Sequence, residues 1–249
     1  MRRRAMLLGA LALVGVAALG FSIERPRGYG VTIDYRQLLA GPPAPNSPAA
    51  VAERAGFAKT AAAIGSARWQ QAARQVFPSG PAVTAEIACA AGVDVAASPA
   101  AGRVVARSVS DLSVAVEAAK TAFRRNRPYV GAPDTRTCDP RTLGSVGGST
   151  GGVLSYSYPS GHAAQGRLVA DVLAAAVPTR AAVLAAWGDR LGDNRVVCRV
   201  HWPSDIVAGR KLGDAMFAAL QADPAFRADL AAARAELARA PAARNCPAA

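Results

Sequence analysis

The sequence predicts an all-α protein that folds as a single-domain helical bundle. Its 249 residues are rich in alanine and only 6% of them are aromatic, a composition that suits closely packed helices. Beyond residue 48, apolar residues recur with helical spacing over most of the chain, and no segment alternates apolar and polar residues as a half-buried strand does. The length is sufficient for one domain with a substantial core.

Residues 1–20 have the features of a secretory signal peptide. Met1 is followed by three arginines, by an apolar stretch from Ala5 to Phe21, and by small residues near Ala18 and Gly20. We therefore expect a periplasmic or secreted protein with no stable membrane association after signal cleavage. The alternative is an uncleaved membrane anchor, because the apolar stretch is only slightly shorter than a full span.

The rest of the chain divides into an arm, a helical domain and a tail. Residues 21–48, rich in Pro, Gly and Ala from Ile33 onward, predict an extended N-terminal arm on the surface. Residues 49–240 predict the helical domain, and residues 241–249 a C-terminal tail.

Helices are expected in close succession through this domain, and several have recognisable start signals. Ser98-Pro99 and Asp223-Pro224 each offer an N-cap residue and a proline at the first helical position, and Ser110 and Thr179 precede two further helices. The expected helices are Ala49–Val76, Ala82–Ala90, Pro99–Ala106, Asp111–Asn126, Gly161–Ala176, Arg180–Val197, Pro203–Ala222 and Pro224–Ala240.

One long segment lacks helical periodicity. Between Tyr129 and Tyr158, Gly, Ser, Thr, Pro and Asp dominate. A loop of this length inside a compact domain is usually functional or disordered. Because it connects the segments that carry Lys120 and His162, we expect it to form the mouth of a functional site.

The cysteine count indicates disulfide bonds. Four cysteines are an even number in a chain expected to be exported, and their spacing does not resemble a zinc site. Four cysteines allow three pairings, and the spacing does not choose among Cys89, Cys138, Cys198 and Cys246.

The formal net charge of +12 favours an anionic partner. A nucleic acid, an anionic membrane surface and anionic small substrates all fit that charge. No segment resembles a nucleic-acid-binding module, and the basic residues are scattered instead of clustered with aromatic ones. We therefore expect small anionic substrates and no nucleic acid.

The segment from Asn194 to Asp205 carries the first candidate site residues. Arg195, His201 and Asp205 follow the pattern Arg-x5-His-x3-Asp. If a helix starts near His201, the spacing of four brings the Asp205 carboxylate to the imidazole, where it holds one ring nitrogen as N–H and leaves the other free to attack. The alternative is a cluster of salt bridges at a helix end.

Two further segments bring complementary chemistry. Pro159-Ser160-Gly161-His162 precedes an apolar helical run, so Ser160 and Gly161 are expected at a helix N-terminus, which binds anions. Lys120 and Arg127 are separated by six residues, nearly two helical turns, so both cations are expected on one helix face that ends before Pro128. Their neighbours Arg124 and Arg125 are expected to form a solvated basic helix end.

In order, these three segments resemble the signature of the type 2 phosphatidic acid phosphatase superfamily (PAP2), which includes bacterial nonspecific acid phosphatases and vanadium haloperoxidases. The likeness to the soluble class A nonspecific acid phosphatases extends from about Tyr35 to about Arg239. It implies the helical bundle of the PAP2/vanadium haloperoxidase type. One departure is Asn194, where the family usually has Ser before the motif arginine.

The resemblance implies a secreted nonspecific acid phosphatase that hydrolyses phosphomonoesters through a phosphohistidine intermediate. His201 would be the nucleophile, Asp205 its orienting partner, and His162 the general acid and base; the chain has no other histidine. A bell-shaped pH profile near about 6.5 would follow. The phosphate would be bound by Lys120, Arg127, Ser160, Gly161 and Arg195.

The resemblance also implies other features of the site. No metal cofactor is expected because cations take over charge neutralisation, and vanadate is expected as an inhibitor. The pairs Cys138–Cys198 and Cys89–Cys246 would be disulfides. Tyr158, Trp202 and Asn194 would line the pocket, although such aromatic residues more often serve packing.

Three other functions remain as alternatives. One is a lipid or isoprenoid (pyro)phosphate phosphatase, another a vanadium-dependent haloperoxidase, and the third a phosphate-binding protein without activity. The sequence favours small phosphomonoester substrates, and homo-oligomerisation is left open.

Overall fold

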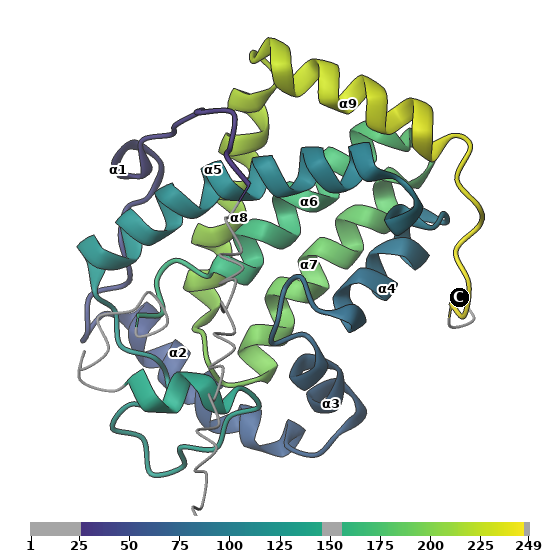
Figure 1. The fold of residues 1–249 in the computed structure, drawn as a ribbon. Coiled ribbons are helices and arrows are strands. Elements are labelled where there is room, and N and C mark those ends of the chain that lie inside the picture. Colours follow the sequence, from purple (N-terminus) through teal and green to yellow (C-terminus); the bar gives the residue numbers. More distant parts are fainter. Residues whose placement is uncertain (1–25, 146–155, 247–249) are drawn as a thin grey trace, which may run out of the picture.

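A computed structural model describes residues 26–145 and 156–246 of the chain (Figure 1). The predicted signal peptide at residues 1–20 lies outside the described residues, as does part of the long loop. The described residues form α-helices joined by short 3-10 turns and no strand beyond an isolated bridge between Val93 and Ala242, so the predicted all-α class is confirmed.

The elements follow one another closely along the chain. They are α1 (Tyr35–Leu38), α2 (Pro48–Lys59), η1 (Thr60–Ala63), α3 (Ala67–Arg74), α4 (Pro81–Ala91), η2 (Val95–Ala97), α5 (Pro99–Phe123), η3 (Pro140–Ser145), α6 (Gly161–Ala176), η5 (Pro178–Arg180), α7 (Ala181–Val197), α8 (Pro203–Leu220) and α9 (Pro224–Leu237). None of the described helices is long and apolar enough to cross a membrane.

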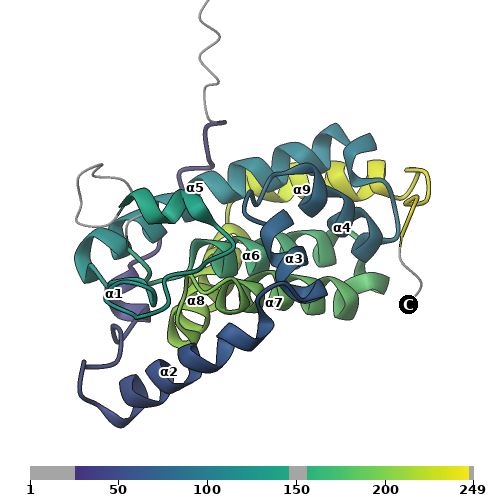
Figure 2. The same cartoon turned by 90° about the horizontal axis from the view of Figure 1, so that it is seen from below.

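Helix α6 lies at the centre of the bundle, where it packs against α5, α7, α8 and α9 (Figures 1 and 2). Glycines permit this close packing. A Cβ atom on Gly188 of α7 would lie 2.5 Å from the carbonyl oxygen of Gly166 on α6, and one on Gly209 of α8 would lie 2.3 Å from the carbonyl oxygen of Ser160. The backbones of α7 and α8 therefore approach α6 at distances that no larger residue allows.

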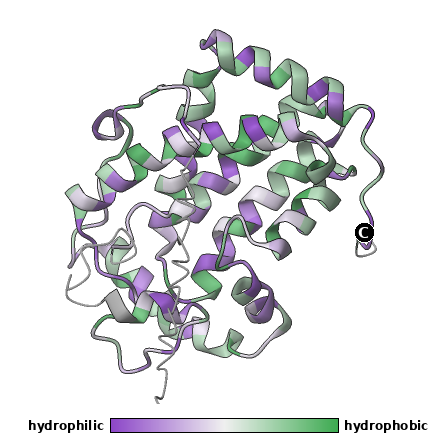
Figure 3. Ribbon diagram, in the orientation of Figure 1, coloured by the Kyte–Doolittle hydropathy of each residue, from purple (hydrophilic) through white to green (hydrophobic). Residues whose placement is uncertain are grey.

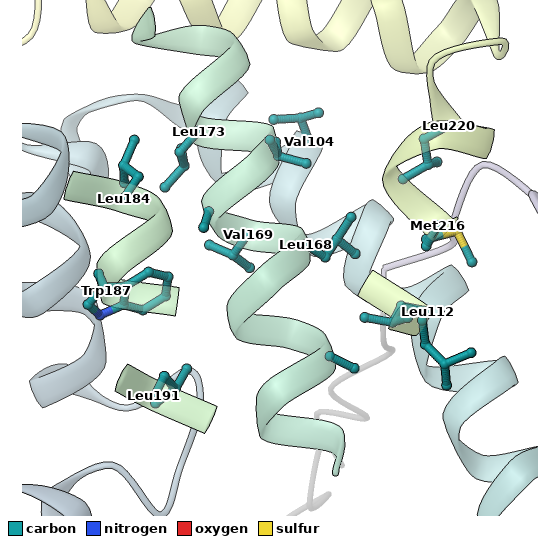
Figure 4. Close-up of a cluster of buried hydrophobic side chains, with 14 of the residues drawn as sticks. Val104, Leu112, Leu168, Val169, Leu173, Leu184, Trp187, Leu191, Met216 and Leu220 are labelled. Atoms are coloured by element: carbon teal, nitrogen blue, oxygen red, sulfur yellow. The ribbon is translucent and has the colours of Figure 1, made fainter. Parts of the chain in front are cut away.

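The core fills the space between these helices. Figure 4 shows Leu112 of α5, Leu168 of α6 and Met216 of α8 within one cluster, and all three side chains are fully buried. Burying each such side chain contributes about 1.5–3 kcal/mol. In Figure 3 the hydrophobic residues gather where the long helices face one another, whereas α3 carries mostly hydrophilic residues.

Two predicted helix boundaries are wrong. The helix expected at residues 49–76 is divided into α2, η1 and α3 because Gly65 has φ +80, outside the helical region.

The helices expected at residues 99–106 and 111–126 are one helix, α5. Ser110, the expected start signal of the second helix, lies inside α5 and does not cap a new helix. Helix α5 ends at Phe123, since Arg124 has the left-handed conformation (φ 47).

The segment expected to be an extended surface arm is packed against the bundle from Pro26 onward. The backbone N–H groups of Tyr29 and Val31 donate to the Asp111 carboxylate on α5 (2.9 and 3.3 Å). The single turn α1 follows, and Tyr35 and Leu39 are buried in the core.

Two disulfides connect distant parts of the chain. Cys89 of α4 pairs with Cys246 near the C-terminus, and Cys138 pairs with Cys198 at the end of α7. These are the two pairs that the resemblance implies. The second pair holds the segment that follows Tyr129 against the end of α7, where the Cys138 N–H also donates to the Cys198 carbonyl (3.1 Å).

Candidate active site

The three sequence motifs meet around one cavity of about 330 Å³. Its wall combines residues from α5, α6, α7 and the segments 76–78, 139–142 and 201. The motif residues in that wall are Lys120, Arg127, Gly161, His162, Arg195 and His201. Residues as far apart as 120 and 201 in the sequence therefore share one concave and strongly basic surface.

His201 and Asp205 form a directly bonded pair. His201 Nδ1 lies 3.2 Å from Asp205 Oδ2, and Arg127 Nη1 lies 3.4 Å from His201 Nε2. Since the guanidinium can only donate, these partners assign the proton to Nδ1 and leave a lone pair on Nε2. Helix α8 begins at Pro203, two residues later than His201, and Asp205 also accepts the N–H of Trp202 (2.8 Å) in its first turn.

The environment disfavours a charged His201. Burial lowers the pKa of this imidazole well below its ordinary value, and the nearby cations Arg127, Lys120 and Arg195 lower it further. His201 is thus held neutral, the form in which Nε2 acts as a nucleophile.

His162 lies in the first turn of α6 on the opposite wall. Its Nε2 lies 3.2 Å from the carbonyl oxygen of Gln75 and 3.3 Å from that of Val76, so Nε2 carries a proton and Nδ1 is the other titrating atom. Burial lowers the pKa of His162 well below its ordinary value, with Arg195 and His201 as further causes. A backbone hydrogen bond from Ser160 to the Asp205 carbonyl (2.9 Å) ties this helix start to that of α8.

Lys120 is a buried cation at the base of the cavity. Its Nζ donates to the carbonyl oxygens of Tyr156 (2.7 Å) and Ser157 (3.4 Å). Burial lowers the pKa of Lys120, and Arg127 adds to that effect. An incoming anion would favour its charged form. Arg127 was expected on the face of the helix that carries Lys120, but it lies beyond the end of α5. Its side chain still lines the cavity, where its Nη1 donates to the Val200 carbonyl oxygen (2.8 Å).

The side chain of Arg195 is buried, but one of its guanidinium nitrogens makes no hydrogen bond to a described residue. Its Nη2 donates to Asp139 Oδ2 (2.9 Å) and its Nη1 to the carbonyl of Ala72 (3.4 Å). Its Nε has no acceptor among the described residues. Burial lowers the pKa of Arg195 to about 10, so the group is cationic at neutral pH. An unpartnered buried donor on the cavity wall suits an oxyanion ligand.

Sequence reasoning did not identify Asp139 and Arg141 as site residues. Asp139 bridges Arg195 and Arg141, whose Nε donates to it at 2.8 Å. Burial alone would raise the pKa of Asp139, but the hydrogen bond from Arg141 and the charge of Arg195 lower it. The clue was available, because Asp139 follows Cys138 and the implied partner Cys198 lies three residues after Arg195.

The sequence interpretation of Arg125 was wrong, since its side chain is largely buried instead of solvated. It donates to Asp205 Oδ1 (2.6 Å) and to Ser204 Oγ (2.7 Å), and it pairs with Glu53 of α2 (2.5 Å). The left-handed residue Arg124, which is exposed as expected, ends the helix and redirects the chain so that Arg125 points inward.

The structure places the two aromatic residues expected to line the pocket away from the cavity wall. Tyr158 packs edge-on against Phe123 in the core (centroids 5.1 Å apart). Trp202 packs against Phe57 and donates its indole N–H to the Asn126 carbonyl (3.0 Å). These aromatic side chains serve packing instead.

The remaining expected contacts are indirect. Asn194 donates to the Gln75 side chain (2.8 Å), whose backbone carbonyl accepts from His162, so Asn194 supports the site through Gln75. The Ser160 hydroxyl caps α6 by accepting the Ala163 N–H (3.3 Å), while Gly161 lines the cavity. Within the described ranges, no group of three or more His, Cys, Asp or Glu residues is placed to hold a metal ion.

Comparison with known proteins agrees with this geometry. The model of the PAP2 superfamily matches residues 100–227, which include all three motifs, and the chain belongs to this superfamily. An acid phosphatase of Zymomonas mobilis is 34% identical over 214 residues, covering 84% of this chain and 77% of the relative. A non-specific acid phosphatase of Salmonella typhimurium is 35% identical over 211 residues, covering 83% and 81%. The protein is thus an enzyme of this phosphatase family, and both of these relatives are named acid phosphatases.

Proposed function

We propose that the protein is a secreted, non-specific acid phosphatase that hydrolyses phosphomonoesters through a phosphohistidine at His201 and without a metal ion. The observation that carries the proposal is the state of His201. Its Nδ1–H donates to the Asp205 carboxylate, burial keeps the ring neutral, and Nε2 lies beside Arg127 in a basic cavity. These are the requirements of an activated nitrogen nucleophile for an anionic substrate.

In the first step, the Nε2 lone pair of His201 attacks phosphorus. The bond between phosphorus and the ester oxygen breaks, its electron pair stays on that oxygen, and protonated His162 supplies a proton there. Since Nε2 of His162 is engaged by the carbonyls of Gln75 and Val76, Nδ1 is the atom that transfers the proton.

In the second step, water attacks the phosphohistidine. His162 Nδ1 takes a proton from that water, the P–N bond breaks, and its electron pair returns to His201 Nε2. The products are the alcohol and inorganic phosphate, and both histidines regain their starting states.

The cavity stabilises the transferring phosphoryl group electrostatically. Charge spreads over three equatorial oxygens in the transition state, so several fixed donors are needed. Lys120, Arg127, the Nε of Arg195 and the N–H groups at the start of α6 supply them. Asp139 fixes the orientation of the Arg195 fork through its Nη2.

The leaving group provides the test of the two histidine roles. We expect His201→Ala to lose turnover of every phosphomonoester by several orders of magnitude. We expect His162→Ala to lose about 10²–10⁴-fold with an alkyl phosphate such as glycerol phosphate, because an alkoxide needs protonation, and far less with p-nitrophenyl phosphate. The measurement is the pre-steady-state rate of phosphoenzyme formation with both substrates. Equal losses on both substrates in His162→Ala would show that His162 is not the acid.

Export of the enzyme is supported by the N-terminal sequence and by the two disulfides, which form in oxidising compartments. Fractionation of cells that produce the full chain tests this part of the proposal. Active enzyme retained in the membrane fraction with its first 20 residues intact would refute cleavage.

A further inference from the structure

A second cavity opens directly from the phosphate cavity. It has a volume of about 660 Å³ and lies among α4, α5, α6 and α7. Four residues line both cavities, namely Pro78, Ser113, Glu117 and Gln165. The two spaces therefore meet at this boundary, and we call the second one the apolar trough.

Three helices, α5, α6 and α7, contribute residues to both the phosphate cavity and the trough. On α6, His162 lies in the phosphate cavity, Gln165 at the boundary, and Val169 and Leu173 in the trough. The spacings of three and four residues put all of them on one helix face. Along this face of α6 the side chains therefore change from polar to apolar with distance from His162.

Helix α7 repeats this gradient. On α7, Arg195 lies in the phosphate cavity, and Leu191 and Trp187, four and eight residues earlier, lie in the trough. Helix α5 shows it only in part: Lys120 lies in the phosphate cavity and Val109 in the trough, but apolar residues of α5 also line the phosphate cavity. Figure 4 shows the side chains of Val169, Trp187 and Leu191 between α6 and α7.

The charges of the trough contrast with those of the phosphate cavity. No Lys or Arg occurs among the described residues that line the trough, and its one charged residue is Glu117 at the boundary. The described lining of the trough therefore offers no cation to neutralise a second phosphate group, which disfavours diphosphates. An uncharged apolar group meets Ile87, Val105, Val109 and Val169 beyond the boundary.

We propose that the apolar trough binds the alcohol part of the substrate, and that the enzyme favours phosphomonoesters of long apolar alcohols. This inference rests on the proposed function, because the phosphate of such a substrate must lie at His201. From Lys120 to Val109 the helix rises about 16 Å, so the trough extends far beyond the reach of glycerol or a methyl group. An extended alkyl chain fills it and gains the free energy of apolar burial.

The first experiment is a chain-length series of linear alkyl phosphates from methyl to decyl, each below its micelle-forming concentration. We expect kcat/KM of the wild-type enzyme to rise about two- to fourfold per methylene until the trough is filled. We expect the Kd of the same compounds for His201→Ala, measured by calorimetry, to fall in parallel. A flat dependence on chain length in both measurements would overturn the inference.

A matched pair of variants on α5 locates the effect. Val109→Phe fills the trough, whereas Val114→Phe changes an exposed residue of the same helix that lines neither cavity. We expect the ratio of kcat/KM for decyl phosphate to that for methyl phosphate to fall at least tenfold in Val109→Phe and to stay at the wild-type value in Val114→Phe. Equal ratios in the two variants would show that the chain binds elsewhere.

The series distinguishes failure of this inference from failure of the proposed function. If phenyl and methyl phosphates are hydrolysed and longer chains bring no gain, the enzyme is a phosphatase and the trough does not bind substrate. If no phosphomonoester of any length is hydrolysed, the proposed function itself falls, and this inference with it. Should Val109→Phe fail to fold, the wild-type and His201→Ala series alone decide.

Discussion

At the scale of single residues, His201 is positioned through a chain of contacts longer than its motif. Asp205 Oδ2 contacts its imidazole, while Asp205 Oδ1 accepts from Arg125, which is itself paired with Glu53 on α2. Burial raises the pKa of Asp205, and Arg125 is the principal group that opposes this. Arg125 therefore favours the ionised form of Asp205, and Asp205 holds His201 in the tautomer with its proton on Nδ1.

A substitution of Arg125 tests this chain of contacts. Arg125→Ala leaves the buried Asp205 with fewer donors, so we expect kcat to fall about 10–100-fold with a smaller change in KM, by analogy with the loss of supporting contacts at other sites. We also expect the acid limb of the pH–rate profile of Arg125→Ala to move to higher pH, because Asp205 is protonated more easily without the Arg125 guanidinium. Arg124→Ala, an exposed neighbour, is the control. Identical kinetics in the two variants would contradict a positioning role.

The pKa shifts of the two histidines set the expected pH dependence. In the proposed reaction His201 must be neutral to attack. Because its pKa is lowered, it stays neutral even when the pH falls below about 6.5, the ordinary pKa of histidine. His162 must be protonated to donate, and its lowered pKa confines that form to the same acidic range. Both limbs of the pH–rate profile therefore move to lower pH. The pH optimum then lies below about 6.5, the value expected for histidines with ordinary pKa values.

A pH profile of phosphoenzyme formation checks this shift. In wild-type enzyme we expect a bell with its maximum below pH 6.5. In His162→Ala, with an aryl phosphate, we expect the basic limb to disappear and the acid limb of His201 to remain. A maximum at or above neutrality would show that the cavity does not disfavour the charged histidines in the complex.

At the scale of elements, the relative position of α6 and α8 decides the site geometry. Gly209 of α8 lies against the Ser160 carbonyl, one residue before α6 begins, and the Ser160 N–H donates to Asp205. The helix that carries His162 and the helix that follows His201 are therefore in contact at their N-termini. Small changes in their separation alter the distance between the rings of His162 and His201, the two residues that we propose to be catalytic.

Gly209→Ala is expected to disturb both stability and activity. Its Cβ would lie 2.3 Å from a backbone oxygen, and such overpacking costs about 1–3 kcal/mol in free energy of unfolding. We expect a lower Tm together with a reduced kcat. Gly56→Ala on α2 is the control, because its Cβ would meet nothing within 4 Å, and it should stabilise the helix by about 1 kcal/mol. An unchanged Tm in Gly209→Ala would refute the close contact.

The Cys138–Cys198 disulfide joins the segment carrying Asp139 to the end of α7. We expect the double variant Cys138→Ser/Cys198→Ser to lose about 2–4 kcal/mol of stability and to raise KM, because Asp139 no longer orients Arg195. The Cys89→Ser/Cys246→Ser variant should lose stability with an unchanged KM. Equal effects on KM, or free thiols in the exported native protein, would contradict this assignment.

At the scale of the whole molecule, the fold gathers basic residues from separate helices into one cavity. Lys120 comes from α5, Arg195 from α7 and Arg127 from the connection after α5. Because these cations neutralise the phosphoryl group, the proposed reaction needs no Mg²⁺ or Zn²⁺.

Chelation tests the role assigned to these cations. We expect activity to survive extended dialysis against EDTA, and vanadate to inhibit competitively by occupying the phosphate site. Loss of activity on dialysis that Mg²⁺ or Zn²⁺ restores would overturn the metal-independent mechanism.

The helical class, most helix positions and the three motifs could be predicted from local sequence patterns. Helical periodicity, N-caps and prolines act over a few residues and are visible locally, as at Asp223-Pro224, where α9 begins as predicted. The motif residues Lys120, His162, Arg195 and His201 were identified because their order and spacing resemble a family.

The surroundings of these residues could not be predicted in this way, because they depend on contacts between helices that are distant in the sequence. The inward direction of Arg125, the bridge made by Asp139, the packing roles of Tyr158 and Trp202, and the apolar trough all depend on which helices meet. Such contacts join residues separated by tens to more than a hundred positions in the sequence. They form because burial and backbone approach bring α6 against its neighbours, and no local pattern in the sequence encodes that arrangement.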